Sequence, residues 1–176
     1  MTNIVHHIIP SPLGAICAAC SETGLCYLEF EENSQRNTSL SDFAKRWNLK
    51  VCHSENKWLE QLGQELDKYF ESRLQKFETP LHFLGSPFQI TVWNKLLEIP
   101  FGKTWSYEYL ASQMNQPLGI RAIAHANGTN PIALLVPCHR VIGKNGDLTG
   151  YAGGLWRKKW LLEHESSGKH QLELNW

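Results

Sequence analysis

The sequence of 176 residues lacks the long apolar segments that mark membrane or exported proteins. No apolar run approaches the roughly 18 residues that a membrane-spanning helix needs. The N-terminal stretch MTNIVHHIIPSP has no basic region followed by a long apolar core, so it does not resemble a secretory signal peptide. We therefore expect a cytoplasmic protein with no membrane partner.

Cysteine is scarce, and its number is odd. The five cysteines are Cys17, Cys20, Cys26, Cys52 and Cys138. An odd count leaves at least one free thiol, and a chain of this length does not need disulfides to fold, so we expect all five to be reduced. A C-x-x-C within a strand directs its two thiols to opposite faces, and no second C-x-x-C follows. We therefore expect no metal, and no other cofactor is indicated.

The chain as a whole has no net charge, but one segment of it is basic. Residues 101–160 carry seven Lys or Arg and two Asp or Glu, although the complete sequence is neutral. A neutral protein with one basic segment can still bind a polyanion, because the local potential drives the encounter. On charge alone, nucleic-acid binding and a chance imbalance are equal alternatives.

The pattern of residues 1–79 predicts a small domain that contains a sheet. The stretches GAICAAC and GLCYLEF predict two strands, and the polar turn SETG between them makes a hairpin. We expect a short helix around residues 39–47 and a longer one over 57–73. The longer helix has an apolar stripe at spacings of three and four: Leu59, Leu62, Leu66 and Phe70. Residues 77–85 predict an extended connector.

Residues 86–176 predict a second, largely helical domain. Its first helix begins with Ser86 as the N-cap and a proline at the first helical position. A second helix follows Ser106, and a third, IRAIAHAN, ends at Gly128. Two short helices joined by a turn of this length form a helix-turn-helix pattern, which is a weak signal when it stands alone.

The chain after the third helix predicts a buried strand followed by a loop and a last helix. The apolar run PIALLV, residues 131–136, predicts the strand, and Pro137 ends it. Residues 144–154 predict a hairpin turn with a loop. Residues 155–165 predict a helix with apolar contacts at Leu155, Leu161 and Leu162. A strand pair after a helix-turn-helix would form a winged arrangement, and the fold class expected for the chain is α+β.

The adjacent Cys138 and His139 suggest an activated nucleophile. A free thiol has a pKa of about 8.5, so little of it is thiolate at neutral pH. Useful reactivity therefore needs a base or a positive field that raises the thiolate fraction. Neighbouring side chains of a strand point to opposite faces, so direct contact would require a bend or a bridging water. The base also needs a carboxylate partner, for which Asp147, Glu163 and Glu165 are the downstream options. A buried structural cysteine beside a surface histidine is the alternative interpretation.

The segment NPIALLVPCHRVIGKNG, followed by TGYAGGLWRKKWLLEHE, resembles the O6-alkylguanine-DNA alkyltransferases, also called methylated-DNA–protein-cysteine methyltransferases. The resemblance is strong over residues 86–166 and weak over 1–78. It implies a small ribonuclease-H-like domain over residues 1–79 and a winged helix-turn-helix domain over residues 86–176. The combined motif is highly specific.

The resemblance also implies an activity. Members of this family repair DNA by moving the alkyl group of O6-alkylguanine to one of their own cysteines, which inactivates the protein irreversibly. The partner would be alkylated double-stranded DNA, bound through its minor groove, with the target nucleotide flipped out of the stack. Repair of O4-alkylthymine is left open. We expect a monomer, with cooperative binding along DNA also left open.

Five residues match the reacting groups of the family. Cys138 matches the alkyl acceptor, His139 matches a base that works through a water, and Glu165 matches the carboxylate that orients the histidine. Asn130 matches a hinge residue that ties the helix-turn-helix to the acceptor segment. Tyr107 matches the tyrosine that crowds the phosphate of the target nucleotide and helps to turn the nucleotide outward.

Further residues match the DNA-contacting and substrate-binding positions. Arg121 matches the side chain that enters the base stack, and Ala122 begins a run of small residues that allows close backbone approach. Lys103, Arg140 and residues 157–159 are candidate phosphate contacts. The substrate pocket implied by the resemblance consists of Val141, Tyr151 and Ala152, with a backbone amide available where some members have a serine at position 152.

Overall fold

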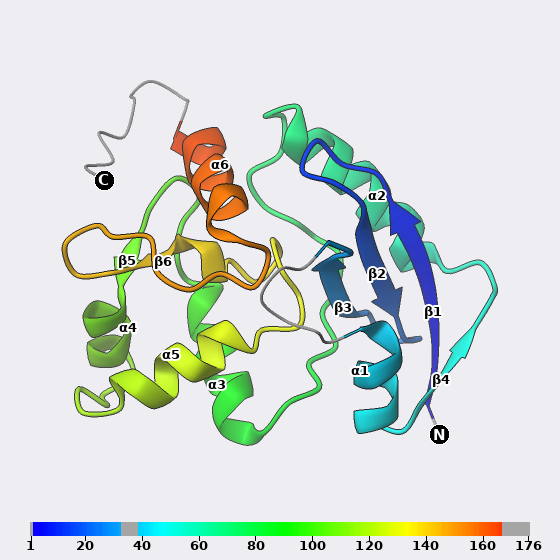
Figure 1. The fold of residues 1–176 in the computed structure, drawn as a ribbon. Coiled ribbons are helices and arrows are strands. Elements are labelled where there is room, and N and C mark those ends of the chain that lie inside the picture. Colours follow the sequence, from blue (N-terminus) through cyan, green and yellow to red (C-terminus); the bar gives the residue numbers. More distant parts are fainter. Residues whose placement is uncertain (1, 33–38, 167–176) are drawn as a thin grey trace. The chain divides into compact units, whose positions relative to one another are not determined.

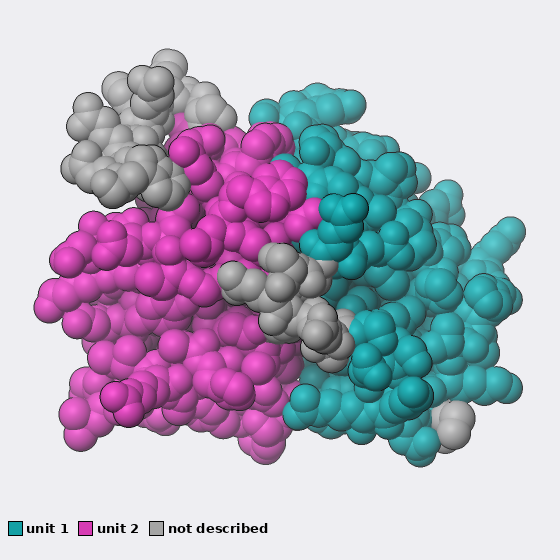
Figure 2. Space-filling model, in the orientation of Figure 1, with its two compact units in different colours: residues 1–84 teal, residues 85–176 magenta. Residues whose placement is uncertain are grey.

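The computed structural model describes residues 2–32 and 39–166 (Figure 1). The chain divides into two compact units, residues 1–84 and residues 85–176, which Figure 2 colours teal and magenta.

A four-stranded sheet organises the first unit. Its strands are β1 (Thr2–Ile9), β2 (Ile16–Cys20), β3 (Leu25–Phe30) and β4 (Leu49–Cys52), in the order β3-β2-β1-β4. The predicted hairpin is confirmed, since β2 and β3 pair antiparallel. Gly24, in the turn between them, has φ +155°, and a Cβ there would lie 2.4 Å from the carbonyl oxygen of Pro80. Glycine therefore allows the turn to approach the connector closely.

Two helices cover the opposite faces of this sheet (Figure 1). Helix α1 (Leu40–Arg46) buries Phe43 and Ala44 against β-strand residues that include Ile4 and Tyr27. Helix α2 (Lys57–Phe70) packs against β1 and β2. Both predicted helices are confirmed. The predicted stripe of α2 is buried except at Phe70, where the preceding Tyr69 takes the buried position.

The second unit is mainly helical and contains the predicted helix-turn-helix. Its elements are α3 (Pro87–Leu96), β5 (Trp105–Ser106), α4 (Tyr107–Gln113), α5 (Ile120–Gly128), the 3₁₀ helix η1 (Cys138–Arg140), β6 (Val141–Ile142) and α6 (Leu155–Ser166). Ser86 and Ser106 cap α3 and α4, as their sequence context predicts. The indole nitrogen of Trp93 donates to the Ala126 carbonyl at 2.9 Å, which fixes α3 against α5.

The predicted strand at residues 131–136 is wrong. The segment forms turns in which the Val136 amide donates to the Ile132 carbonyl at 3.1 Å, and Leu134 has φ 67°. Every residue of the run is buried. An apolar run buried on all sides looks like a buried strand in the sequence, because hydrophobicity alone cannot distinguish the two.

The expected pairing of two strands that both follow the helix-turn-helix is also wrong. Strand β6 follows α5 but pairs in parallel with β5, which precedes α4. The predicted turn does occur, since the Gly143 amide donates to the Asp147 carbonyl at 2.8 Å. In α6, Leu161 and Leu162 are buried as predicted, whereas Leu155 is 41% exposed. The α+β fold class and the division into two units are confirmed by the architecture.

No helix in the described ranges is long and apolar enough to cross a membrane. The cytoplasmic location stays a prediction. All five cysteines carry free thiols. Within residues 2–32 and 39–166, no group of three or more His, Cys, Asp and Glu side chains could hold a metal ion.

Candidate active site around Cys138

Cys138 opens the one-turn helix η1, directly after Pro137. It is only 7% exposed, and its amide donates to the Val136 carbonyl at 2.8 Å. The buried amide of Asn130 supports this turn: its Nδ2 donates to the carbonyls of Val136 (2.9 Å) and Ile132 (3.3 Å), and its Oδ1 accepts from the Ile132 amide (2.9 Å). Asn130 thus satisfies backbone groups that a strand would have paired with a neighbour.

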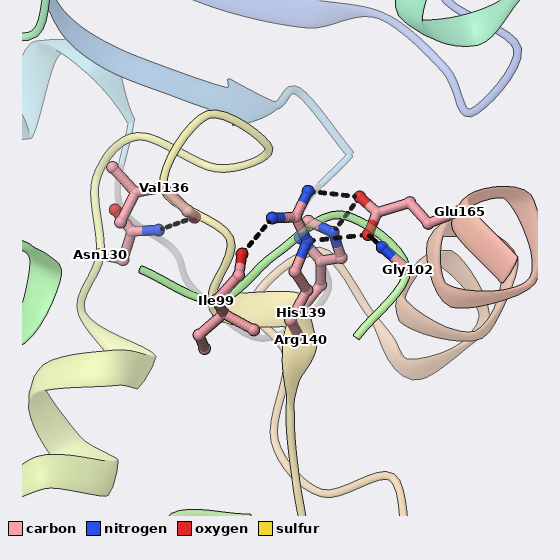
Figure 3. Close-up of polar contacts among 7 residues, drawn as sticks. All are labelled: Ile99, Gly102, Asn130, Val136, His139, Arg140 and Glu165. Carbon is pink, nitrogen blue, oxygen red and sulfur yellow. Dashed lines mark hydrogen bonds and ion pairs between the residues drawn. The ribbon is translucent and has the colours of Figure 1, made fainter. Parts of the chain in front are cut away.

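His139 is fully buried and contacts Glu165 (Figure 3). Its Nε2 lies 2.8 Å from Oε1 of Glu165. A carboxylate only accepts hydrogen bonds, so the neutral imidazole carries its proton on Nε2. Nδ1 is buried and has no hydrogen-bond partner among the described residues. Burial lowers the pKa of His139 despite the nearby carboxylate, so the neutral ring offers Nδ1 as a basic nitrogen.

Arg140 completes a buried charge cluster with the same carboxylate. Its guanidinium donates to both oxygens of Glu165, at 2.8 and 3.0 Å, and to the Ile99 carbonyl at 2.7 Å (Figure 3). Burial alone would raise the pKa of Glu165, but the hydrogen bond from His139 and the hydrogen bonds and positive charge of Arg140 outweigh it, and this pKa lies well below its ordinary value. The positive guanidinium of Arg140 therefore favours the ionised form of Glu165.

The expectation that Arg140 contacts a DNA phosphate is therefore wrong for this structure. Its side chain is buried, and its guanidinium hydrogen bonds go to Glu165 and Ile99. Arg157 and Lys158 are corrected for the same reason. Arg157 is 3% exposed and donates to the Gly153 carbonyl at 2.9 Å, and Lys158 is fully buried. Arg157 and Lys158 belong to the interior of the second unit, where both donate to backbone carbonyls.

Gly102 also approaches the Glu165 carboxylate. Its amide lies 3.4 Å from Oε2 of Glu165, in the turn before β5. The residue has φ +70°, and a Cβ there would lie 2.8 Å from the Glu165 carbonyl oxygen. Both the left-handed backbone and the close approach require glycine.

Lys158 brings a buried positive charge toward Cys138. Its Nζ donates to the carbonyls of Val141 at 2.6 Å and Thr149 at 2.9 Å. Burial lowers the pKa of Lys158 to about 8, whereas the negative charge of an ionised Cys138 acts to raise it. The two charges therefore stabilise each other. Lys158 also ties β6 to the loop that leads to Tyr151 and Ala152.

Tyr107 lies at the same centre from the first position of α4. Its hydroxyl oxygen accepts from Nδ2 of Asn127 at 3.3 Å and is hydrogen-bonded by the side chain of Thr149. Burial raises the pKa of Tyr107, and the negative charge of Cys138 adds to the effect. This charge effect indicates that the tyrosyl hydroxyl and the thiol are near each other.

The remaining pocket and DNA-contacting candidates separate into buried and exposed groups. Val141 and Tyr151 are buried, and Ala152 is half-buried. Arg121 and Ala122 lie exposed near the start of α5, and Lys103 is exposed before β5. The exposed candidates on α5 thus remain accessible to a large partner, unlike Arg140.

Sequence reasoning missed Lys158 and Asn127 as parts of this centre. Each is a polar residue within a buried helical stripe. Lys158 lies seven residues before Glu165 on α6, with Leu161 and Leu162 between them on the buried face. Asn127 shares the buried face of α5 with Ile123 and Ala126. A polar residue at an apolar position of the helical period was the available signal.

The fold and the site define a class: a two-unit protein whose second unit combines a helix-turn-helix with a cysteine that lies beside a buried histidine–carboxylate pair. Family models match both units. Residues 4–83 match the ribonuclease-like domain of 6-O-methylguanine DNA methyltransferase, and residues 87–167 match its DNA binding domain.

Individual relatives match over almost the whole chain. The methylated-DNA–protein-cysteine methyltransferase of Shigella flexneri is 41% identical over 94% of this chain and 97% of its own length. The enzyme of the same name from Methanosarcina barkeri is 38% identical over 92% and 97%. The crystal structure of Mycobacterium tuberculosis O6-methylguanine methyltransferase has a TM-score of 0.79 at 37% identity, with 97% of both chains covered.

A structure of the Mycobacterium tuberculosis protein in complex with DNA matches with a TM-score of 0.78 at 38% identity, over 94% of this chain and 93% of that one. The chain belongs to the 6-O-methylguanine DNA methyltransferase family. The resemblance inferred from the Pro-Cys-His-Arg segment is confirmed.

Proposed function

We propose that the protein repairs DNA by moving the alkyl group of O6-alkylguanine to Cys138. The observation that carries the assignment to this cysteine is that His139, the next residue in the chain, forms a buried pair with Glu165 and has no hydrogen-bond partner at Nδ1 among the described residues. Family membership supports the reaction class, since the relatives are methylated-DNA–protein-cysteine methyltransferases. O4-alkylthymine is a second substrate to be tested.

The chemistry begins with the proton of the thiol. His139 accepts it at Nδ1 through a water, and the ionised Glu165 stabilises the imidazolium that forms. The Cys138 sulfur then attacks the alkyl carbon in line, forming a C–S bond while the C–O6 bond breaks. The electron pair of that bond leaves with guanine, which takes up a proton. The Tyr107 hydroxyl and the backbone amides near Tyr151 are candidate donors to the leaving base.

Single use follows from the product. A thioether has no carbonyl for water to attack, so a methylated Cys138 cannot be hydrolysed back to the thiol as an acyl-enzyme can. The reaction consumes one protein for each lesion. No bound cofactor is needed for any bond made or broken in this sequence.

The target must leave the duplex before it can reach a buried thiol. Cys138 is 7% exposed, and O6 of guanine lies inside the base stack. Helix α5 carries Arg121 and Ala122 on its exposed side, where an arginine can replace a flipped base and a small residue permits close approach. Docking of α5 in the minor groove suits a search for damage, because that groove offers little sequence information.

Intact mass spectrometry after incubation with duplex DNA that contains O6-methylguanine tests the proposal. The expected result is a gain of one methyl group per protein, located on Cys138, with no further gain when DNA is in excess. Tight binding without a change of mass would instead support a non-catalytic damage-binding protein. Repeated turnover of an acyl substrate would support a cysteine hydrolase.

Arg121→Ala tests the role of α5. The rate of repair of duplex DNA is expected to fall by roughly 10- to 100-fold, since one inserted side chain contributes about 1–3 kcal/mol. Reaction with free O6-benzylguanine should be unchanged, because no base has to be flipped. Equal losses with both substrates would contradict the insertion role.

A further inference from the structure

Asn127 is a buried polar residue that the reaction described above does not use. It lies in the last turn of α5, is 2% exposed and shares a face with apolar residues. Its Nδ2 donates to the Tyr107 hydroxyl oxygen at 3.3 Å. Its Oδ1 is buried and has no hydrogen-bond partner among residues 2–32 and 39–166. An asparagine buried this deeply costs stability unless its amide has a task, because each unpaired polar atom loses its hydration.

The direction of this hydrogen bond matters. The Asn127 amide donates, so the tyrosyl oxygen accepts and its own proton is left for another acceptor. The Thr149 side chain also hydrogen-bonds to the Tyr107 hydroxyl and favours the ionised phenol. Donors to a hydroxyl oxygen polarise its O–H bond and make it a stronger donor. The Asn127 amide therefore prepares Tyr107 to give a hydrogen bond.

The bond also connects two parts of the helix-turn-helix. Tyr107 is the first residue of α4, and Asn127 lies at the opposite end of the motif, in the last turn of α5. The negative charge of an ionised Cys138 acts on Tyr107, so the oxygen that Asn127 holds is electrostatically coupled to the reacting sulfur. Asn127 thus joins the exposed helix α5 to the atoms around Cys138.

We propose that Asn127 is a positioning residue that orients and polarises the Tyr107 hydroxyl toward the departing guanine. It acts through the tyrosine and does not touch the alkyl group. The inference rests on the proposed function, because it needs guanine to leave from Cys138.

A double-mutant cycle on the rate of methyl transfer measures this role. The four proteins are the wild type, Asn127→Leu, Tyr107→Phe and the double variant, each given excess O6-methylguanine duplex in single-turnover experiments. Asn127→Leu is expected to lower the maximal rate about fivefold to tenfold, the effect of one neutral hydrogen bond. In the Tyr107→Phe background the same substitution should change the rate by less than about twofold, since the acceptor oxygen is gone.

Asn127→Asp and Asn94→Leu complete the set. Aspartate has the shape of asparagine but cannot donate, so it should be at least as slow as leucine. Asn94 is an exposed residue of α3, and its change to leucine should leave the rate unaltered. Protein labelled with ¹³C at the tyrosine Cζ gives a second measurement, the pKa of Tyr107, which a loss of packing alone would not change. The pKa of Tyr107 should rise further in Asn127→Leu, because a donor to the phenolate is lost.

The outcomes separate the two proposals. A wild-type protein that gains no methyl group would overturn the proposed function and this role with it. A wild-type protein that is methylated normally, together with an Asn127→Leu protein of equal rate, would overturn only the role of Asn127. An equal loss with and without the Tyr107 hydroxyl would do the same, because it would assign the effect to packing. A rate that depends on Asn127 only when that hydroxyl is present supports the inference.

Discussion

The two units of this protein bury cysteines in opposite ways. In the first unit, Cys20 and Cys26 are fully buried in the hairpin of β2 and β3, and burial raises the pKa of each to about 12. The thiol of Cys26 donates to the Ala19 carbonyl. In the second unit, Cys138 is almost as buried, but His139 follows it in the chain, and its thiolate charge acts on the Lys158 ammonium and the Tyr107 hydroxyl. Burial alone makes a thiol inert, so the reactivity of Cys138 must come from its neighbours.

The largest expected effect breaks this comparison directly. Cys138→Ala should abolish methyl transfer completely, because the accepting sulfur is removed. Cys26→Ala should retain it, since a thiol with a pKa of about 12 is protonated at neutral pH. Intact mass after incubation with O6-methylguanine duplex measures both. Binding to undamaged duplex should be preserved in Cys138→Ala. A methyl group found on a cysteine of the first unit would contradict the contrast.

The next effect concerns the carboxylate behind Cys138. Glu165→Gln leaves the Arg140 guanidinium buried without its counter-charge, so the free energy of unfolding should fall by about 3–5 kcal/mol. Methyl transfer should slow by roughly 10²–10⁴-fold, since His139 loses the group that fixes its tautomer. Urea unfolding and single-turnover kinetics measure the two losses.

Glu163→Gln is the matched control for this substitution. Glu163 lies on the same helix, but it is exposed, and its ion pair with the Lys159 ammonium is long, at 3.9 Å. Its removal should change the free energy of unfolding by less than about 0.5 kcal/mol. Similar losses in the two variants would show that the effect comes from the net charge of α6, and not from the contact of Glu165 with His139.

The sequence predicts the scaffold of the second unit better than the site that the scaffold holds. The caps Ser86 and Ser106 and the stop at Gly128 are local signals, and the corresponding helices are confirmed. The turn at residues 131–136 was missed, because its stability depends on the Asn130 side chain reaching backbone groups up to six residues away. No propensity of an apolar run contains that information.

The carboxylate partner of His139 illustrates the same limit. Residue spacing left Asp147, Glu163 and Glu165 open, and only the family resemblance selected Glu165. In the structure Glu165 is buried, whereas the other two are exposed. Which of the two α6 carboxylates is buried depends on the face of α6 that meets η1, and that is a tertiary property. Arg140 was misassigned for the related reason that a basic residue is usually exposed unless it is paired.

A smaller effect tests the ammonium that distinguishes Cys138 from the cysteines of the first unit. Lys158→Met removes the buried charge and keeps most of the side-chain volume. One nearby charge shifts a pKa by about one unit or more, so methyl transfer at neutral pH should slow by about tenfold. The loss should shrink at higher pH, where the thiol ionises without help. The ultraviolet absorbance of the thiolate, followed against pH, measures the change independently of DNA.

Lys159→Met serves as its control, because the Lys159 side chain is 40% exposed and pairs only weakly with Glu163. It should react with free O6-benzylguanine, which has no phosphate, at the wild-type rate, whereas Lys158→Met should be slowed with this substrate too. A Lys158→Met protein whose rate follows pH as the wild type does would show that Lys158 serves only to hold its two carbonyl acceptors.

The smallest expected effect is the response of this region to acid. The pKa of His139 is lowered by burial, so below pH about 6.5 the unfolded chain binds a proton that the folded chain does not. The stability contributed by the neutral ring is therefore complete above that pH and is lost as the pH falls. Glu165, with its pKa also lowered, adds a second loss below about pH 4.3. The free energy of unfolding should drop by at most about 1.4 kcal/mol per pH unit from His139.

His139→Gln should remove the first of these losses and leave the second. Between pH 6.5 and pH 5, the unfolding free energy of wild type minus that of the variant should therefore decrease, as denaturant titrations at fixed pH can show. The rate of methyl transfer by the wild type gives a second measure. The rate should begin to fall only below pH about 6.5. Burial lowers the pKa of His139, so Nδ1 stays unprotonated, and able to accept the thiol proton, down to that pH. An acidic limb above that pH would mean that His139 is charged when Cys138 is at rest, and the neutral base assigned to the site would be wrong.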